Sequence, residues 1–318
     1  MTVAASATVV AEEIVRSDVL ITRSRVCVGT GSEPTPDRVA GRLLAWYEPR
    51  RDAFPWRQAP GPYGVLVSEV MLQQTQAPRV VGAYERFLAA FPTLEALAAA
   101  RRAEVLRVWA GLGYHRRAVA LHEAARRIVR DLGGRVPSDP GELRRLPGVG
   151  PYTAAAVASI AFDVPVPAID TNVRRVVARA RLGAQPGDVP APRIAEEAAR
   201  WLDPERPGDW NQAVMDLGRE ICRPRPRCAA CPILDGCRAR GPGPGAARRA
   251  PRQGGFEGSR RQLRGRIVAA LRERALLEPR DLGALTGFAE AEVLGALEGL
   301  TRDGVVERVG ARVRLAEG

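Results

Sequence analysis

The chain has 318 residues, and its 48 basic and 36 acidic side chains give a formal net charge of +12. Hydrophobic residues make up 46% of the sequence, which is typical of globular proteins and excludes a fibrous or wholly disordered chain. The length predicts two or three domains, and the positive charge indicates a polyanionic partner. All 48 basic residues are arginine, which excludes mechanisms that need a lysine amine, such as Schiff-base catalysis.

The N-terminal region carries no sign of a targeting segment. Its first residues lack a basic stretch and contain Glu12 and Glu13, which argues against a secretory signal. No apolar run is long enough to predict a transmembrane helix. Residues 1–36 show no sustained periodicity, so we expect a disordered extension there. The expected location is cytoplasmic, in association with the nucleoid.

Residues 37–240 are predicted to form a mainly α-helical region. Apolar residues recur there at three-to-four spacing, and Gly and Pro interrupt the pattern at short intervals, which predicts short, closely connected helices. These helices are expected over residues 38–49, 62–76, 79–91, 94–100, 103–112 and 116–132. No alternating strand pattern precedes residue 240.

The C-terminal part is predicted to be a separate small α+β domain. Residues 241–258 are rich in Gly, Pro and Arg, which is typical of a flexible linker. Over residues 259–318, three helical patterns precede an alternating pattern around a Val-Gly turn, which predicts a β-hairpin. This is the element order of a winged helix. Such a module either contacts DNA or serves only in packing or dimerisation, and the pattern leaves both hypotheses open.

The stretch LPGVG, residues 146–150, lies between two helical patterns. Gly148 and Gly150 would let a phosphate approach backbone N–H groups at a helix N-terminus. Such a helix-hairpin-helix element holds the DNA backbone without reading its sequence. The alternative is an ordinary turn between helices.

Two acidic residues are candidates for catalysis. Glu69 lies inside the apolar stretch VLVSEVML, where burial would raise its pKa and suit it to general-acid work. Asp170 precedes a helical pattern, and an aspartate there is most often an N-cap, although a capping carboxylate that faces a cleft can also stabilise a cation. The polar side chains that follow Glu69 are suited to hydrogen bonds with base edges; they are Gln73, Gln74 and Thr75.

Four cysteines follow the pattern C-x5-C-x2-C-x5-C, at Cys222, Cys228, Cys231 and Cys237. This crowding predicts a metal or cluster site in a reducing compartment. Zinc and a [4Fe–4S] cluster both accept four thiolates, and the spacing does not choose between them. Arginines flank the ligands, so the loop is cationic and suited to phosphates.

Together these motifs resemble the helix-hairpin-helix base-excision DNA glycosylases, and among them the MutY family of adenine DNA glycosylases. The resemblance covers roughly residues 38–240 and includes FPWR, VSEVMLQQTQ, GLGY, LPGVGPYTA, the Asp-x-Asn-Val-x-Arg-Val run and the cysteine loop. It implies two α-helical subdomains with a DNA cleft between them, and a [4Fe–4S] cluster on the four cysteines.

The resemblance also implies catalytic roles. Glu69 matches the family's general acid, which would protonate N7 of a flipped-out adenine. Asp170 matches the carboxylate that stabilises the oxocarbenium-like sugar, and Tyr152 and Asn172 match residues that support this pair. Endonuclease III-like enzymes have a strand-cleaving lysine at the position of Tyr152, so the resemblance implies a monofunctional glycosylase.

Further residues match the family's DNA contacts. Trp56 and Arg57 match part of the adenine pocket, whereas Gln74 and Tyr114 match residues that enter the duplex near the opposing base. Adenine must leave the stack before it can react. The implied partner is double-stranded DNA with adenine opposite 8-oxoguanine or guanine, and the enzyme is expected to be a monomer without membrane contacts.

Two features depart from the family pattern. The gap between Cys222 and Cys228 is five residues instead of the usual six. Typical members also carry a C-terminal Nudix-like domain that recognises 8-oxoguanine, where this chain has the winged-helix-like sequence. We therefore expect Tyr114 and Gln74 to carry most of the lesion sensing and the C-terminal unit to add DNA contacts.

Three alternatives compete with adenine removal. A mismatch thymine glycosylase can also have tyrosine at position 152, but Glu69 within VSEVMLQQTQ favours adenine. Oxidised-pyrimidine repair is disfavoured by the missing lysine. A non-catalytic iron–sulfur regulator that binds DNA would leave Glu69, Asp170 and Tyr152 unexplained.

Overall fold

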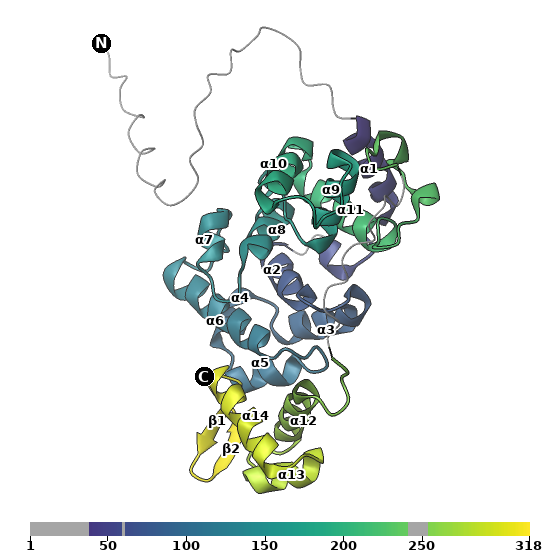
Figure 1. Ribbon diagram of the computed structural model, residues 1–318. Helices are drawn as coiled ribbons and strands as arrows, with labels where there is room; N and C mark the ends of the chain where they lie inside the picture. Colours follow the sequence, from purple (N-terminus) through teal and green to yellow (C-terminus); the bar gives the residue numbers. More distant parts are fainter. Residues whose placement is uncertain (1–37, 59–60, 241–253) are drawn as a thin grey trace, which may run out of the picture. The chain divides into compact units, whose positions relative to one another are not determined.

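The computed structural model describes residues 38–58, 61–240 and 254–318. The expected N-terminal extension and most of the expected linker lie outside these ranges. Within them the chain is mainly α-helical, and the two strands of the one sheet come after residue 305 (Figure 1). The predicted fold class, mainly α with a small C-terminal α+β part, is confirmed.

The first group of helices builds one hydrophobic core. Its buried members include Leu66, Phe87, Trp109 and Leu121, which are apolar side chains at helical spacing. The contributing helices are α2 (Gly61–Leu72), α3 (Ala77–Ala90), α4 (Leu94–Ala99), α5 (Arg102–Val108), α6 (Arg116–Asp131), α7 (Pro140–Arg144) and α8 (Pro151–Phe162). The same core continues into the C-terminal elements, through buried residues such as Leu263, Val293 and Val313.

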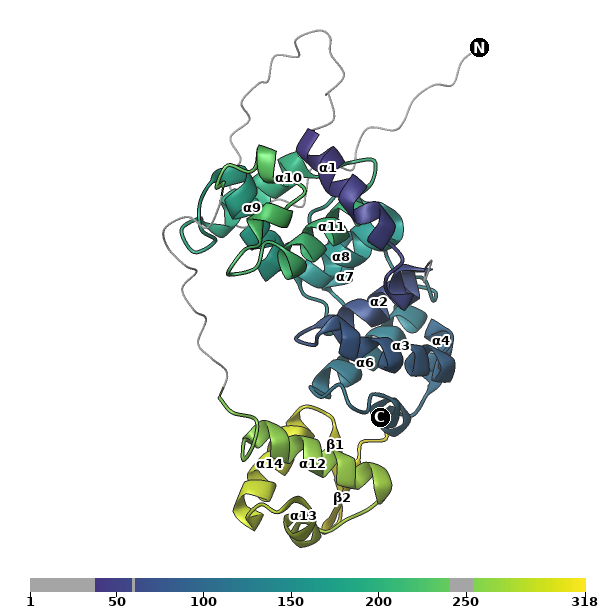
Figure 2. The same ribbon diagram turned by 90° about the vertical axis from the view of Figure 1, so that its right-hand side faces the viewer.

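A second core joins the first described helix to helices far along the chain. Here α1 (Arg38–Tyr47) packs on α11 (Pro207–Glu220), with α9 (Thr171–Leu182) and α10 (Ala191–Trp201) alongside (Figure 2). Helix α8 contacts both α2 and α11, so it joins the two helical groups. The expected pair of α-helical subdomains is therefore present.

Local sequence explains where several helices begin. The side chains of Thr93, Asp139, Asp170 and Ser259 each accept a backbone N–H at the start of a helix, which satisfies donors that the helix itself leaves unpaired. Helices α9 and α13 end at glycines in the left-handed conformation, a common stop signal. The described residues also contain short 3₁₀ helices: η1 (Glu48–Arg50), η2 (Pro55–Arg57), η3 (Cys228–Ala230) and η4 (Leu234–Gly236).

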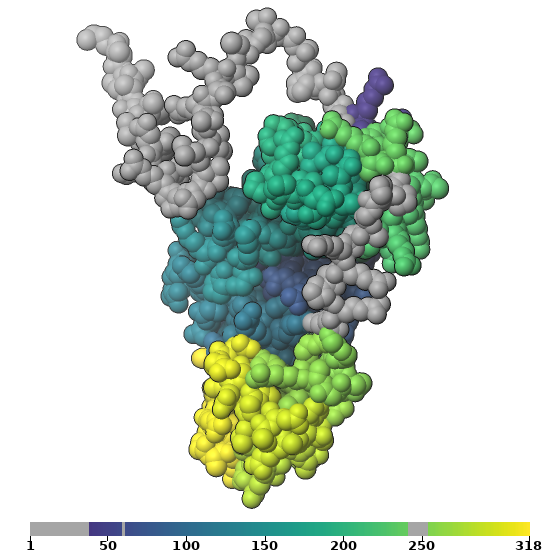
Figure 3. Space-filling view, viewed as in Figure 1, coloured from purple at the N-terminus to yellow at the C-terminus, as the bar shows by residue number. Residues whose placement is uncertain are grey.

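The C-terminal elements follow the predicted order. They are α12 (Arg260–Glu273), α13 (Pro279–Thr286), α14 (Glu290–Arg302), β1 (Val306–Val309) and β2 (Arg312–Leu315). The strands pair antiparallel with Val306 opposite Leu315, and their side chains pack with the helices into one lobe, shown in yellow and yellow-green in Figure 3. The backbone N–H of Arg102 donates to Glu317 O at 3.1 Å. None of the described helices is long and apolar enough to cross a membrane.

Candidate active site

Glu69 is a buried carboxyl group in the middle of α2. Every residue from Gly64 to Met71 is buried, and Glu69 itself is 5% exposed. Among the described residues, its Oε2 atom has no hydrogen-bond partner. Burial is the main cause that raises the pKa of Glu69 to about 7, and the charge of Asp170 adds to it. The carboxyl group is thus poised to hold and release a proton near neutral pH.

Asp170 caps α9, as the sequence predicts. Its Oδ1 accepts the backbone N–H groups of Asn172 and Val173 at 2.8 and 2.7 Å, and its Oδ2 accepts Asn172 Nδ2 at 2.7 Å. Arg175 donates to Asn172 Oδ1 at 2.8 Å. Three donors therefore fix the carboxylate of Asp170, and an arginine fixes one of the donors.

Tyr152 lies in the first turn of α8, between the two carboxyl groups and α11. Burial and the charges of Glu69 and Asp170 raise the pKa of its hydroxyl well above the usual value. The hydroxyl also lowers the pKa of Glu69 through a hydrogen bond, and its oxygen lies 3.4 Å from Met215 Sδ. Tyr152 therefore places a neutral phenol beside Glu69. Strand cleavage through a Schiff base would need a lysine amine at this position.

A pocket of about 420 Å³ opens beside α2, a volume in the range of small-molecule sites. Trp56 and Arg57 line it, whereas Glu69, Tyr152 and Asp170 are not among its lining residues. Trp56 stacks on Phe54 with ring centroids 4.8 Å apart, and Arg57 forms a bidentate ion pair with buried Asp216 at 2.8 and 3.1 Å. The other lining residues are Arg51, Gly61, Val65, Ile160, Ala161, Asp209 and Gln212.

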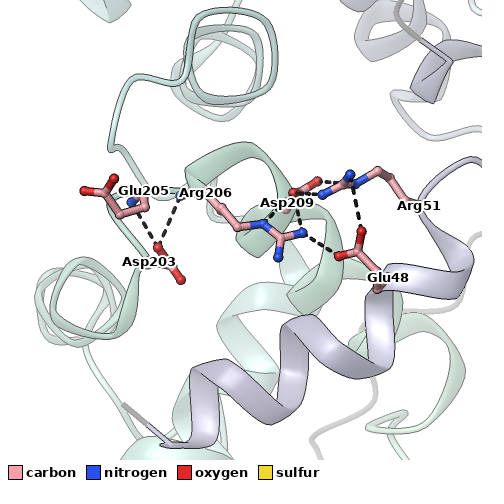
Figure 4. A network of polar contacts seen from close by, with 6 residues as sticks. All are labelled: Glu48, Arg51, Asp203, Glu205, Arg206 and Asp209. Carbon is pink, nitrogen blue, oxygen red and sulfur yellow. Dashed lines mark hydrogen bonds and ion pairs between the residues drawn. The ribbon is translucent and has the colours of Figure 1, made fainter. Parts of the chain in front are cut away.

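Sequence reasoning missed three polar residues of this pocket: Arg51, Asp209 and Gln212. Figure 4 shows that the first two belong to a polar network. Asp209 accepts from Arg51 Nε at 3.1 Å and from Arg206 Nε at 3.0 Å, and Arg206 also donates to Glu48 at 2.6 Å. Arg51 and Asp209 are 158 residues apart in sequence, so no local pattern could have joined them.

The glycine hairpin between α7 and α8 has the predicted form. Gly148 has φ +76°, and a Cβ there would lie 2.7 Å from Ala120 Cβ, so only glycine fits this position. Gly150 is the N-cap of α8, and both glycines are exposed. Gln73 Nε2 donates to Gly148 O at 3.3 Å and to Thr153 Oγ1 at 3.1 Å. Gln73 thus connects the end of α2 to the hairpin.

Gln74 and Tyr114 are exposed at two loop tips, Tyr114 at 41%. Both have positive φ, +56° and +46°, a conformation that costs a non-glycine residue about 1 kcal/mol or more. Thr75 is half-buried, and its hydroxyl accepts Arg117 Nη2 at 3.1 Å. Of the polar run after α2, Gln74 is therefore the residue most open to a partner.

The four cysteines lie in the loop after α11, around η3 and η4. All four are free and half-buried. Burial raises the pKa of Cys231 to about 11, and the other three thiols add to this. Arg179 Nη1 lies 3.8 Å from Cys222 Sγ, and Arg175 Nε donates to Cys222 O at 2.6 Å. Within the described ranges, no three His, Cys, Asp or Glu side chains are arranged to hold a single metal ion.

Known repair proteins have sequences similar to this chain. Residues 67–204 match the model of the HhH-GPD superfamily base excision DNA repair proteins. An adenine DNA glycosylase of Mycobacterium tuberculosis is 44% identical over 277 residues, which are 84% of this chain and 89% of that protein. The human adenine DNA glycosylase is 45% identical over 212 residues. These residues are 63% of this chain but 39% of the human protein, so the match spans well under half of that relative.

Solved structures with a similar fold include two repair proteins. A thermostable thymine-DNA glycosylase has a TM-score of 0.59 and 31% identity, and the match covers 63% of this chain and 94% of that one. An endonuclease III in a non-covalent DNA complex has a TM-score of 0.54 and 25% identity, over 65% of this chain and 96% of that one. The fold and the site thus define a helix-hairpin-helix protein of base-excision repair. Within that class, the chain belongs to the family of adenine DNA glycosylases.

Proposed function

We propose that this protein hydrolyses the N-glycosidic bond of adenine that lies opposite 8-oxoguanine or guanine in double-stranded DNA. The observation that carries the proposal is the pair of carboxyl groups with different surroundings. Glu69 is buried with its pKa near 7, whereas three donors hold the carboxylate of Asp170. Two carboxyl groups in contrasting environments are a common basis for one acid and one anionic stabiliser.

The proposed chemistry follows from these positions. Adenine leaves the stack and binds beside Arg57, whose charge acts on Glu69. Protonated Glu69 gives its proton to N7, so the electrons of the breaking C1′–N9 bond pass to a neutral leaving group. Asp170 stabilises the cationic sugar that forms, and Asn172 holds Asp170 in place. A water oxygen then bonds to C1′ and gives a proton to the carboxylate of Glu69, which restores the acid and leaves free adenine and an abasic site.

The test is single-turnover release of adenine from a duplex with one adenine opposite 8-oxoguanine. We expect release by the wild type and a loss of about 100-fold or more in Glu69→Gln, because general-acid catalysis contributes on that scale. Glu85→Gln is the matched control, because Glu85 is an exposed carboxylate on α3. The same assay on G·T and oxidised-pyrimidine duplexes tests the rival glycosylases, and release from either without adenine release would overturn the proposal.

We propose that Cys222, Cys228, Cys231 and Cys237 hold a [4Fe–4S] cluster. Four thiols in one short loop, unpaired and close enough to affect one another's pKa, are a donor set that such a cluster accepts. When bound, the cluster would supply a fixed anchor for the cationic loop. Arg179 would offset part of the thiolate charge at Cys222. Iron and sulfide analysis of anaerobically purified protein tests this, and zinc in place of iron would overturn it.

We propose that the C-terminal lobe contacts DNA through α12. Five arginines lie on α12, whereas α14 exposes Glu290, Glu292 and Glu298, which phosphates would repel. Burial, followed by the charges of Arg264 and Arg272, lowers the pKa of His115 to about 4. The charges of Arg264 and Arg272 on α12 thus act on His115, the neighbour of Tyr114.

This proposal is tested with Arg272→Gln and the matched control Arg280→Gln on α13, where the side chain is 73% exposed. Binding of lesion DNA is measured across a salt series. Loss of one phosphate contact lowers the slope of log K against log salt by about 1, and we expect this in Arg272→Gln alone. Equal slopes in the two variants would remove the claim.

We further propose that the protein binds DNA as a monomer. Sedimentation of the DNA complex, which gives its mass, tests this.

A further inference from the structure

Arg117, at the second position of α6, connects the loop after α2 with the loop before α6. Its Nη1 donates to Val70 O, Met71 O and Gln73 O at 3.0, 2.8 and 2.5 Å. These carbonyls lie at the C-terminal end of α2 and just beyond it. Its Nη2 lies 3.1 Å from Thr75 Oγ1, and 3.4 Å from both Leu112 O and Gly113 O. One guanidinium therefore binds the loop after α2 and the loop before α6.

These contacts bracket the two strained residues of the region. Gln73 and Thr75, both bound by Arg117, are the neighbours of Gln74, which has φ +56°. On the other loop, Gly113 O accepts from the Arg117 side chain, and Tyr114 O accepts the Arg117 backbone N–H at 2.9 Å. Tyr114 has φ +46°. Residues persist in this conformation only where their surroundings hold them, and Arg117 holds both.

The charge of Arg117 has no acidic partner. Within the described part of the chain, no carboxylate pairs with it, and its Nε atom is buried without a hydrogen-bond partner. Burial lowers the pKa of Arg117 to about 10, so it stays protonated at neutral pH. Its Cζ lies 5.4 Å from the ring centroids of both Trp109 and Tyr114. The guanidinium of Arg117 thus contacts the aromatic ring of Tyr114 on one loop and binds the backbone beside Gln74 on the other.

We propose that Arg117 is a positioning residue that joins the loops of Gln74 and Tyr114 into one preorganised wedge for the duplex. It sets how readily the target base is extruded and leaves the acid chemistry at Glu69 unchanged. The inference rests on the proposed function, in which Gln74 and Tyr114 enter the duplex. A planar guanidinium with several fixed donors can reach both loops together, whereas the single ammonium of lysine cannot.

The test measures base extrusion apart from bond cleavage. The duplex carries 2′-fluoro-2′-deoxyadenosine opposite 8-oxoguanine, because fluorine disfavours the cationic sugar and slows hydrolysis. A neighbouring 2-aminopurine brightens when the base leaves the stack. We expect Arg117→Lys and Arg117→Met to extrude the base about 100-fold more slowly than the wild type, since small misplacements of positioning groups cost that much. The matched control is Arg116→Met, at the exposed neighbouring arginine.

Two further measurements separate positioning from general loss of structure. The pH midpoint of adenine release should match the wild type in Arg117→Lys, because the surroundings of Glu69 are unchanged. Thr75→Val removes the acceptor of Arg117 Nη2 and the 3.4 Å bond from the Thr75 hydroxyl to Gln73 O. It keeps the other Arg117 contacts, so it should slow extrusion by a smaller factor even if the Arg117 variants fold poorly. Extrusion at the wild-type rate in Arg117→Lys or in Thr75→Val would overturn the proposal. Extrusion by the wild type in the fluorinated duplex, without adenine release from the unmodified duplex, would refute the glycosylase function separately.

Discussion

Two charged groups of the first helical core, Glu69 and Arg117, are accommodated in opposite ways. Glu69 Oε2 has no partner, and burial raises the pKa of the carboxyl group to about 7. Arg117 has six oxygen atoms within 3.4 Å of its Nη1 and Nη2 atoms and stays charged. Burial raises the pKa of a carboxyl group toward neutral pH, whereas several hydrogen bonds hold a guanidinium in one position. The difference separates a group suited to proton transfer from one suited to holding loops.

Replacing Asp170, a carboxylate held by three hydrogen bonds, tests the role of a fixed anion. Asp170→Asn should lower adenine release by about 1000-fold, because an anion beside a developing cation acts mainly in the transition state. Stability should fall by less than about 1 kcal/mol, since asparagine is also a good N-cap. Single-turnover kinetics and urea unfolding measure the two effects. Equal losses of rate in Asp170→Asn and in the surface variant Glu85→Gln would contradict the assigned role.

The ion pair of Arg57 and Asp216 offers a third way to bury charge, in which each group neutralises the other. Their side chains are 7% and 5% exposed. Asp216→Ala should cost about 3–5 kcal/mol of unfolding free energy, because it leaves a buried guanidinium without its carboxylate. The exposed pair of Arg193 and Glu196 gives the control, and Glu196→Ala should cost less than about 1 kcal/mol. If Asp216→Ala lowered the free energy of unfolding by as little as Glu196→Ala does, Arg57 would have found another partner.

The pH dependence of stability examines Glu69 directly. Its pKa is about 7 in the folded protein against 4.5 for the unperturbed group. A raised carboxyl pKa stabilises the protonated fold fully below pH 4.5, and this contribution is lost as the pH rises through 7. Relative to Glu69→Gln, the wild type should lose about 3 kcal/mol between pH 4 and pH 9, measured by urea unfolding. The rate of adenine release should also fall as the pH rises through 7. If the stabilities of the wild type and Glu69→Gln changed equally with pH, Glu69 would not be a buried acid.

The smallest effect concerns the packing behind Asn172. A Cβ at Gly218 would lie 2.7 Å from Asn172 Cβ, so Gly218→Ala should displace the residue that holds Asp170 and cost about 1–3 kcal/mol. Gly265, on α12, has open space around it, and Gly265→Ala should stabilise the protein by up to about 1 kcal/mol. Thermal unfolding compares the two. A neutral Gly218→Ala would mean that α9 and α11 can separate without cost.

Sequence reasoning was most successful where one element carries the information. The buried position of Glu69 follows from its apolar neighbours on α2, and the cap at Asp170 follows from its place before α9. The hairpin of Gly148 and Gly150 and the C-terminal helix order are likewise local patterns. Residues brought together by tertiary packing were missed, as Gln212 and Asp209 in the pocket show. Asp216 lies in the short apolar stretch AVMDLG of the otherwise polar helix α11, a weaker form of the signal that points to Glu69.

The packing of α1 on α11 also has a consequence during synthesis on the ribosome. The two helices are separated by about 160 residues, from Tyr47 to Pro207. At translation rates of about 5–20 residues per second, α11 is synthesised roughly 8–30 s after α1. Leu43, Leu44 and Tyr47, all buried in the finished fold, are exposed to solvent during that interval. The nascent chain is therefore vulnerable to misassociation at this apolar face until α11 completes the second core.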